Sequence, residues 1–378
     1  MENFSSPPVI PQPPVITPPP PQRPRKSYGW MIVAIILIVL LAFSLLGNFT
    51  QFISHALRSG FGDGFKNSTA HEAGPKLDEV ILKDNDAHNK IAVVTVDGII
   101  TGSTEDPAGN NMVDVIKAQL NRAAEDSRVK AVILKVNSPG GEVMASDEIN
   151  KVIKDFENNP IHGKPVICSM GSLAASGGYY ISTPCRWIVA NELTITGSIG
   201  VIMHGYNYRG LMDKIGVRPV TYKSGKFKDM LSPDRETNQI PPEEHAMVQS
   251  LIDQTYQKFK SVVAEGRGQA HEKNKNEGRV LASDWAQYAD GRVLSGAEAL
   301  KLGFVDELGD FDDAVDRAEK IAHIGNANIV EYRERYNIGD FLSMFGQNSS
   351  AKNIKLDLGV DIPKLHAGYM YFLWAPEN

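Results

Sequence analysis

The pattern of hydrophobic and polar positions changes several times along the chain. Residues 6–24 are largely proline without an apolar period, which predicts a disordered tail that is partly polyproline II. Residues 30–46 contain no charged side chain, and with their flanking residues they reach the ~20 positions that a bilayer-spanning helix needs. A mixed stretch follows from about residue 50 to 88, and residues 90–325 then alternate between strand-like and helix-like segments.

This alternation predicts the fold class. Short, apolar and β-rich runs predict strands at 90–96, 130–136, 166–170, 187–190 and 219–222. Helical spacing of apolar residues predicts helices at 111–125, 243–265, 295–302 and 312–324. Strands that alternate with helices favour a mostly parallel α/β arrangement.

We therefore expect a disordered tail (1–27), a transmembrane anchor (28–49), a linker (50–88), an α/β domain (89–325) and a C-terminal extension (326–378). Arg23, Arg25 and Lys26 precede the apolar run, which favours a cytoplasmic N-terminus and an extracytoplasmic location for everything after residue 50. The run 369–374 is unusually apolar, so we expect it to pack against something, with a neighbouring subunit as one option.

Composition narrows the function classes. Hydrophobic residues make up 42% of the chain, which is enough for an ordinary core. A net charge of −6 argues against nucleic-acid binding as the main role. No metal-ligand spacing and no phosphate-binding glycine loop is present, so we expect no metal and no cofactor. Two cysteines, Cys168 and Cys185, are too few for a disulfide framework; a bridge between them is conceivable, but packing thiols are favoured.

The run SMGSLAASGGYYI (169–181) places one serine at a predicted turn from strand to helix. Such a turn holds the Ser176 hydroxyl clear of the backbone, and the amides of the following helix favour negative charge beside it. Small neighbours let a substrate backbone approach closely. Ser176 is therefore a candidate nucleophile for acyl transfer, although a serine here could also simply cap the helix.

A second glycine-bearing loop follows another predicted strand, at SPGG (138–141). Consecutive glycines free backbone N–H groups to point at an anion. In acyl transfer these donors, together with the Gly177 amide, would stabilise the oxyanion of the tetrahedral intermediate. An ordinary strand-to-helix turn is the alternative, because Pro-Gly and Gly-Gly are common turn sequences.

A serine nucleophile also needs a general base. The chain has nine histidines, and none has an acidic residue placed to suggest a relay. Lysine can serve instead where burial disfavours its charged form. Lys223, Lys226 and Lys228 share a strip with apolar residues, and spacing alone does not choose among them.

Six ordered blocks resemble the signal peptide peptidases of the SppA type, which are Ser-Lys proteases related in fold to the Clp protease and the crotonases. The blocks are VNSPGG (136–141), AASGGYY (174–180), TGSIGVI (196–202), SGKFKD (224–229), ADGRV (289–293) and GFVDELG (303–309). The resemblance implies a Clp protease/crotonase-like fold of repeated ββα units. It implies Ser176 as nucleophile, Lys228 as general base and Ser198 as the hydroxyl that orients the lysine. Gly141 and Gly177 are implied as oxyanion donors, and substrate-binding residues stay unassigned.

The resemblance implies a membrane-anchored serine endopeptidase. Its expected substrates are signal-peptide remnants and other unfolded or membrane-associated polypeptides, which are largely apolar. Two alternatives remain: a crotonase-type acyl-CoA enzyme, and a non-catalytic scaffold of the same fold. An acyl-CoA enzyme has no need of Ser176, and the intact Ser176 and Lys228 argue against a scaffold.

The resemblance also bears on assembly. Long members of the family carry two copies of the fold, with the lysine in one half and the serine in the other, whereas no internal repeat is visible in this sequence. A single-copy chain would have to bring Ser176 of one subunit against Lys228 of the next, which requires a closed ring of identical subunits. Analogy suggests about eight subunits.

Overall fold

The structure is a computed structural model that describes residues 37, 38, 40, 41, 74–103, 110–335 and 370–374. The chain divides into two units, Met1–Glu72 and Ala73–Asn378, which are described separately. The predicted tail, and the predicted anchor apart from four helical residues (37, 38, 40 and 41), lie outside the described residues. Within the described ranges, no helix has both the length and the apolar character needed to span a bilayer.

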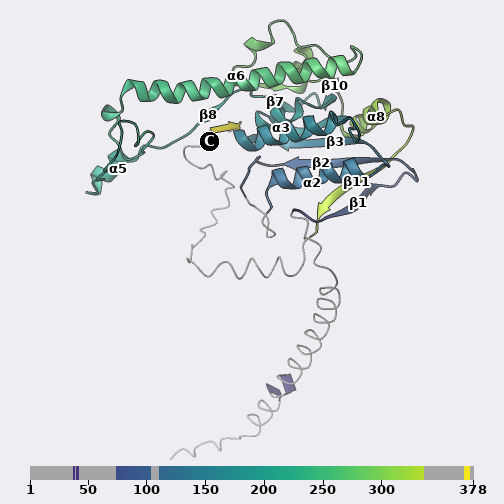
Figure 1. Cartoon of the computed structure of the whole chain (residues 1–378), viewed down its shortest axis with the longest axis horizontal. Helices are drawn as coiled ribbons and strands as arrows, with labels where there is room; N and C mark the ends of the chain where they lie inside the picture. Colours follow the sequence, from purple (N-terminus) through teal and green to yellow (C-terminus); the bar gives the residue numbers. More distant parts are fainter. Residues whose placement is uncertain (1–36, 39, 42–73, 104–109, 336–369, 375–378) are drawn as a thin grey trace, which may run out of the picture. The chain divides into compact units, whose positions relative to one another are not determined.

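A mixed sheet of nine strands forms the centre of the second unit, in the order β1-β11-β2-β3-β5-β6-β10, with β7 paired to β5 and β9 paired to β7 (Figure 1). The central strands are parallel, as the alternating pattern predicted, and β1 and β9 pair antiparallel with their neighbours. The strands are β1 (Leu77–Lys83), β2 (Lys90–Asp97), β3 (Val129–Ser138), β5 (Val166–Ala175), β6 (Trp187–Ala190), β7 (Ile195–Gly197), β9 (Val293–Ser295), β10 (Glu307–Leu308) and β11 (Asn328–Glu334).

Helices cover both faces of this sheet. On β2, Ala92 and Val94 belong to one apolar cluster and Ile91 and Val93 to another, because successive side chains of a strand point to opposite faces. The larger cluster includes residues of α2 (Met112–Glu125), α3 (Val143–Glu157), α4 (Gly177–Ser182), α6 (Pro242–Lys273) and α7 (Gly296–Lys301), and the smaller includes α8 (Phe311–Ile321).

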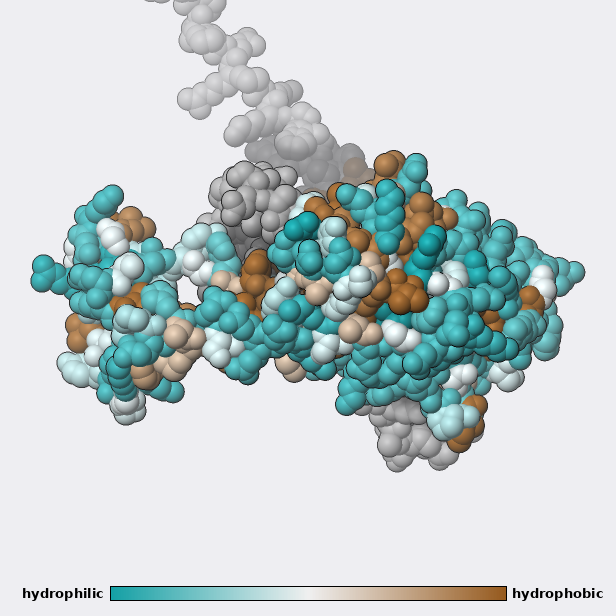
Figure 2. All heavy atoms as spheres, turned by 90° about the horizontal axis from the view of Figure 1, so that it is seen from above, coloured by the Kyte–Doolittle hydropathy of each residue, from teal (hydrophilic) through white to brown (hydrophobic). Residues whose placement is uncertain are grey.

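Helix α6 extends well beyond the sheet. At 1.5 Å per residue it is ~48 Å long, and its buried apolar residues begin only at Phe259. The segment before it contains α5 (Arg209–Lys214) and the 3₁₀ turn η1 (Thr237–Gln239), and Figure 1 shows α5 near the first turns of α6, away from the sheet of the second unit. We call residues 204–251 the arm. Many of its large apolar side chains are exposed, and Figure 2 shows them on the end that stands apart from the main body.

A small second sheet lies beside the first, in the order β4-β12-β8. The apolar run near the C-terminus forms β12 (Met370–Leu373), which pairs antiparallel with both β4 (Gly140–Glu142) and β8 (Ile202–Met203). Phe372 is fully buried, with its ring centroid 4.9 Å from that of Tyr180 and 4.7 Å from that of Phe259. The run therefore packs within its own chain.

Three local predictions were incomplete or wrong. No strand forms at 219–222, where Val220 and Tyr222 are 75% and 94% exposed, because none of the strands that the structure describes pairs with them. Strand β1 lies inside the range expected to be linker. Helix α3 was not predicted, because its buried face includes the polar residues Ser146 and Asn150.

Candidate active site

Ser176 lies at the turn between β5 and α4 with an unusual backbone conformation. Its φ is 54° and its ψ is −115°, a left-handed φ that favours glycine. Its N–H donates to Gly197 O (2.8 Å), its carbonyl accepts from Tyr180 N (2.8 Å), and its side chain makes no capping hydrogen bond with α4. The helix-capping alternative is therefore excluded. A non-glycine residue in a sparsely populated region costs about 1–3 kcal/mol and is characteristic of functional sites.

The glycine loop at the start of β4 lies directly against this turn. A Cβ added to Gly140 would lie 2.6 Å from Gly177 N, and one added to Gly177 would lie 3.1 Å from Gly141 N. The first distance is too short for a side chain, and the second is tighter than most real Cβ contacts; a Cβ on Gly177 would also lie 2.7 Å from Ser146 Oγ, so glycines favour this close approach. The structure thus brings together the turn that carries Ser176 and the amides of Gly141 and Gly177.

Two buried tyrosines hold α4 in place behind Ser176. The hydroxyl of Tyr179 donates to Phe304 O (2.9 Å), and that of Tyr180 donates to the Asp147 carboxylate (2.5 Å). Burial raises the pKa of both tyrosines well above the usual value, so both remain neutral donors. The strained turn is therefore supported by a rigid second layer of side chains.

Ser198 follows β7, the strand that pairs with the end of β5. Like Ser176 it has a positive φ (51°), and it is 6% exposed. Ala175 pairs with Gly197 in the sheet, so the two serines follow neighbouring strand ends. The structure therefore brings Ser198 to the same edge of the sheet as Ser176.

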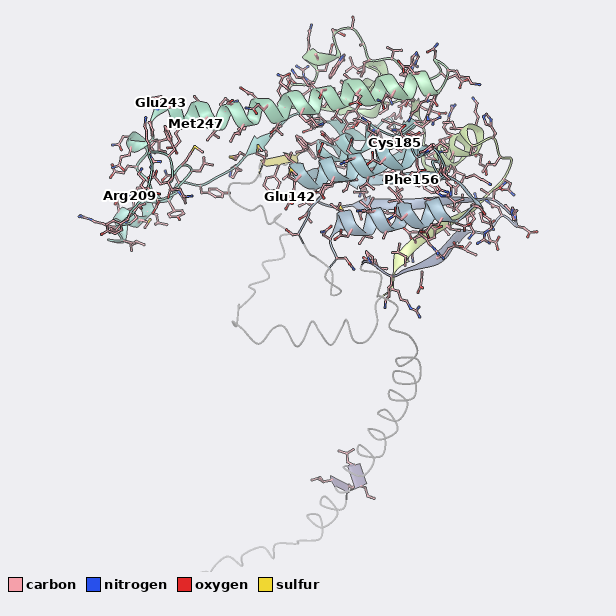
Figure 3. All side chains as sticks on the ribbon, in the orientation of Figure 1. Glu142, Phe156, Cys185, Arg209, Glu243 and Met247 are labelled. Carbon is pink, nitrogen blue, oxygen red and sulfur yellow. The ribbon has the colours of Figure 1, made fainter. Side chains whose placement is uncertain are left out.

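Lys228 lies elsewhere in the chain. It is exposed in a turn of the arm that is tied to the first turn of α6, where Leu231 N donates to Glu244 Oε1 (3.0 Å). Glu244 precedes Phe259, the α6 residue whose ring contacts Tyr180, by ~22 Å along the helix. In Figure 3, Glu142, at the end of β4, lies well apart from Glu243 on the arm. A single chain does not place Lys228 beside Ser176.

The structure does distinguish the three candidate lysines. Lys223 is paired with Asp229 (2.7 Å) and Lys226 with Glu243 (3.5 Å). Lys228 has no carboxylate within ion-pair distance in the part of the chain that the structure describes. Spacing could not reveal this difference, because it depends on the fold of the arm.

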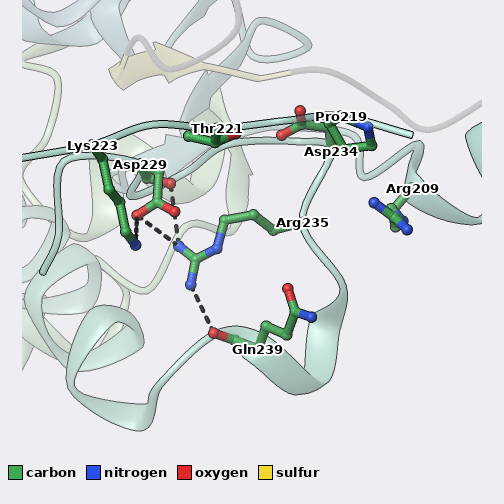
Figure 4. Close-up of a pocket in the computed structure, with 8 residues that line it drawn as sticks. All are labelled: Arg209, Pro219, Thr221, Lys223, Asp229, Asp234, Arg235 and Gln239. Carbon is green, nitrogen blue, oxygen red and sulfur yellow. Dashed lines mark hydrogen bonds and ion pairs between the residues drawn. The ribbon is translucent and has the colours of Figure 1, made fainter. Parts of the chain in front are cut away.

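A polar cavity of about 280 Å³ also lies in the arm (Figure 4). It is lined by Arg209, Pro219, Thr221, Lys223, Asp229, Asp234, Arg235 and Gln239. Its walls are charged and it does not include Ser176, so it is not the cleft of an apolar substrate. Sequence reasoning missed the ion pairs of this cavity, although the alternating charges between residues 223 and 244 could have indicated them.

The sequence profile of Peptidase family S49 matches residues 160–325, which include Ser176, Ser198 and Lys228. A protein named for signal peptide peptidase SppA in Enterococcus faecium is 37% identical over 262 residues, which cover 68% of this chain and 71% of that protein. The chain belongs to peptidase family S49. This confirms the resemblance and identifies the chain as a serine peptidase.

Other S49 relatives differ in length. Protease 4 of Salmonella typhi is 34% identical over 290 residues, which cover 77% of this chain but only 44% of that protein. The chloroplastic serine protease SPPA of Arabidopsis thaliana is 30% identical over 267 residues, which cover 69% of this chain and 37% of that protein. The S49 chain therefore spans less than half the length of these two relatives.

Among solved structures, a point mutant of ClpP1 from Listeria monocytogenes covers 59% of this chain and 94% of its own, with 18% identity and a TM-score of 0.35. This similarity is too low to assign a narrower fold class. The topology of the S49 chain itself establishes a mixed α/β fold.

Both cysteines of the S49 chain are free and fully buried. Cys168 Sγ lies 3.2 Å from Ser182 Oγ, and burial raises the pKa of the Cys185 thiol. In the described ranges, no three His, Cys, Asp or Glu side chains converge as a metal site would require.

Proposed function

We propose that this S49 chain is a membrane-anchored serine endopeptidase with Ser176 as nucleophile and Lys228 as general base. The strained turn at Ser176, set against the amides of Gly141 and Gly177, is the observation that carries this proposal. The Ser176 hydroxyl would attack the peptide carbonyl carbon while neutral Lys228 accepts its proton. The two glycine amides would hold the resulting oxyanion, with Ser198 orienting the lysine.

The intermediate would then collapse as the C–N bond breaks, and Lys228 would return its proton to the leaving amine. Water would hydrolyse the acyl-enzyme by the same proton transfers and regenerate Ser176. No step needs a metal or a cofactor.

The active site is proposed to be shared between subunits. Lys228 lies at the far end of α6 from Ser176, so a neighbouring subunit is the available source of the base. The exposed apolar side chains of the arm support this assembly, because contact with a second copy would cover them. We propose that these head-to-tail contacts close into a ring, and analogy with the S49 family suggests about eight subunits.

Substrates are proposed to be extended, apolar peptides, including signal-peptide remnants and other unfolded or membrane-associated polypeptides. Strand β12 supports this class, because it pairs with both β4 and β8 beside the glycine loop. A Cβ on Gly140 would meet Phe372 O at 2.0 Å, so an extended backbone can run against these glycines. A substrate strand would take the same path after displacing β12, with an apolar side chain in the place of Phe372.

The bilayer is the remaining proposed partner. An anchor at residues 28–49, with a cytoplasmic N-terminus and an extracytoplasmic catalytic unit, would keep the site close to substrates left in the membrane. Nothing favours the acyl-CoA enzyme or the scaffold, because neither needs a serine held at φ 54°.

An active-site probe and a complementation experiment test the proposal together. A fluorophosphonate should label the wild-type protein at Ser176 and leave Ser176→Ala unlabelled. Ser176→Ala and Lys228→Ala subunits, each inactive alone, should regain part of the peptidase activity when they are co-assembled. Labelling that persists in Ser176→Ala would refute the nucleophile, and mixed assemblies without activity would refute the shared site.

A further inference from the structure

The turn that carries Lys228 is held by a charged cluster that the proposed mechanism does not use. Arg235 Nη1 donates to the backbone carbonyl of Asp229 (3.2 Å) and to Glu244 Oε2 (2.8 Å). The other Glu244 oxygen accepts from Leu231 N (3.0 Å), and Arg235 Nη2 donates to Gln239 O (2.7 Å). Arg235 and Glu244, which we call the clamp, therefore hold the backbone on the C-terminal side of Lys228 (Figure 4 shows Arg235 with Asp229).

The clamp is much less exposed than the neighbouring charges. The side chain of Arg235 is 14% exposed and that of Glu244 is 5% exposed. The adjacent pair of Lys226 and Glu243 is 62% and 63% exposed, with a looser distance of 3.5 Å. A shielded, hydrogen-bonded pair orders a loop far better than an exposed pair does. Glu243 therefore offers a matched control for Glu244.

The clamp also balances the charge next to Lys228. The Asp229 carboxylate accepts from Lys223 Nζ at 2.7 Å, and Arg235 Nη1 lies 3.6 Å from it. The hydrogen bond from Lys223 lowers the pKa of Asp229, which therefore stays ionised. An uncompensated carboxylate beside a lysine favours the charged lysine, whereas a general base must be neutral.

Other charged groups surround this turn. They lie on the loop itself, on the first turn of α6 and on α5: Lys223, Lys226, Asp234, Glu236, Glu243, Arg209 and Asp213. Among these, Lys223 is the cation placed against Asp229, where it joins Arg235 of the clamp.

We infer that Arg235 and Glu244 are positioning residues for Lys228: they fix the turn that presents the lysine, and Arg235 offsets the adjacent Asp229 carboxylate. The inference rests on the proposed role of Lys228 as the general base. It assigns the clamp a role in catalysis, although neither residue touches the peptide.

The test measures kcat and KM against pH for the full-length protein carrying Arg235→Gln, Arg235→Lys, Glu244→Gln, Glu243→Gln or Lys228→Ala. Arg235→Gln should lower kcat by up to about 100-fold, because the base is misplaced, with little change in KM. It should also move the acid limb of the profile upward, by up to about one pH unit, because Arg235 no longer offsets its share of the Asp229 charge and Lys223 alone remains. Adding Asp229→Asn to Arg235→Gln should return the acid limb of the pH profile to its wild-type position.

The remaining variants distinguish the effect of the position of Lys228 from the effect of the charge on Asp229 beside it. Arg235→Lys keeps the charge without the planar fork, so kcat should fall while the acid limb stays in place. Glu244→Gln should lower kcat, and Glu243→Gln should match the wild type. Circular dichroism and sedimentation of each variant report whether it folds and assembles.

The outcomes distinguish the two proposals. If Lys228→Ala is inactive while Arg235→Gln and Glu244→Gln keep the wild-type kcat and acid limb, the clamp inference is wrong and the proposed function stands. Should the Gln variants fail to assemble, Arg235→Lys decides, and a wild-type kcat in that variant overturns the inference. Full activity in Lys228→Ala would overturn both.

Discussion

Replacing Ser176 by glycine should stabilise the protein while abolishing its activity. The residue holds a φ of 54° with ψ at −115°, which costs a non-glycine residue about 1–3 kcal/mol. Glycine removes this strain but loses about 0.5–1 kcal/mol through the greater freedom of its unfolded chain. The expected net gain of Ser176→Gly over Ser176→Ala is the difference between these two terms, about 0–2.5 kcal/mol with a midpoint of about 1 kcal/mol.

Ser176→Ala is the proper reference for this measurement. Both variants lack the hydroxyl, so neither can digest itself during unfolding, and they differ only by one Cβ. Ser182, at the end of α4, provides a control pair in an ordinary helical position, where its side chain donates to Gly178 O. There the order should reverse, with Ser182→Gly less stable than Ser182→Ala by about 1 kcal/mol.

Thermal unfolding followed by far-UV circular dichroism provides the assay. Subunit concentration must be equal in all samples, because association shifts the midpoint. For a domain of about 150–250 residues, 1 kcal/mol corresponds to about 2–4 °C, so Ser176→Gly should melt several degrees above Ser176→Ala. If Ser176→Gly melts at or below Ser176→Ala while the Ser182 pair behaves as expected, the turn is not strained and the reasoning fails.

Three further predictions concern other parts of the chain. Lys228→Ala should lower peptide hydrolysis by on the order of 10³-fold or more, whereas Lys226→Ala should keep most of it; equal losses would argue against Lys228 as the base. Burial would raise the pKa of Asp126, but hydrogen bonds led by those from Arg128 hold it well below the usual 3.8. The ionised Asp126 carboxylate therefore stabilises the fold fully above about pH 4. The difference in free energy of unfolding between wild type and Asp126→Asn, measured by urea unfolding, should shrink as the pH falls below about 4. A difference that stays constant would contradict the assignment. A protease added to spheroplasts should digest the region after residue 50 and spare the proline-rich tail, and the reverse result would invert the proposed topology.

The sequence predicted those elements whose partners are near in the chain. Strands β3 and β5 were predicted because they are continuous apolar runs, with both of their faces covered. Helix α4 was predicted from the glycines that follow Ser176. Strand β11 was not predicted, because its partners β1 and β2 lie more than 200 positions earlier. Apolar character alone suggested a strand at 219–222, but a strand also needs a neighbour, and the described residues supply none there.

The candidate site divides in the same way. Ser176 and the glycine amides were predictable because each follows a strand of one parallel sheet, and parallel strands end at a common edge. The choice among Lys223, Lys226 and Lys228 was not predictable from spacing, because it depends on which carboxylates the folded arm brings near.

Ser176 and Lys228 lie in separate parts of one chain, and this separation determines how activity would depend on assembly. The strain at Ser176 is offset within one chain, by the sheet that precedes it and by the buried tyrosines of α4. The proposed nucleophile would therefore be formed by folding alone. The backbone that follows Lys228 is held by the clamp, but on an arm that its own chain keeps away from Ser176. Folding thus prepares both halves of the proposed dyad separately, and only contact between subunits would unite them. An isolated subunit would then be folded but inactive, which would restrict proteolysis to the interior of a completed ring.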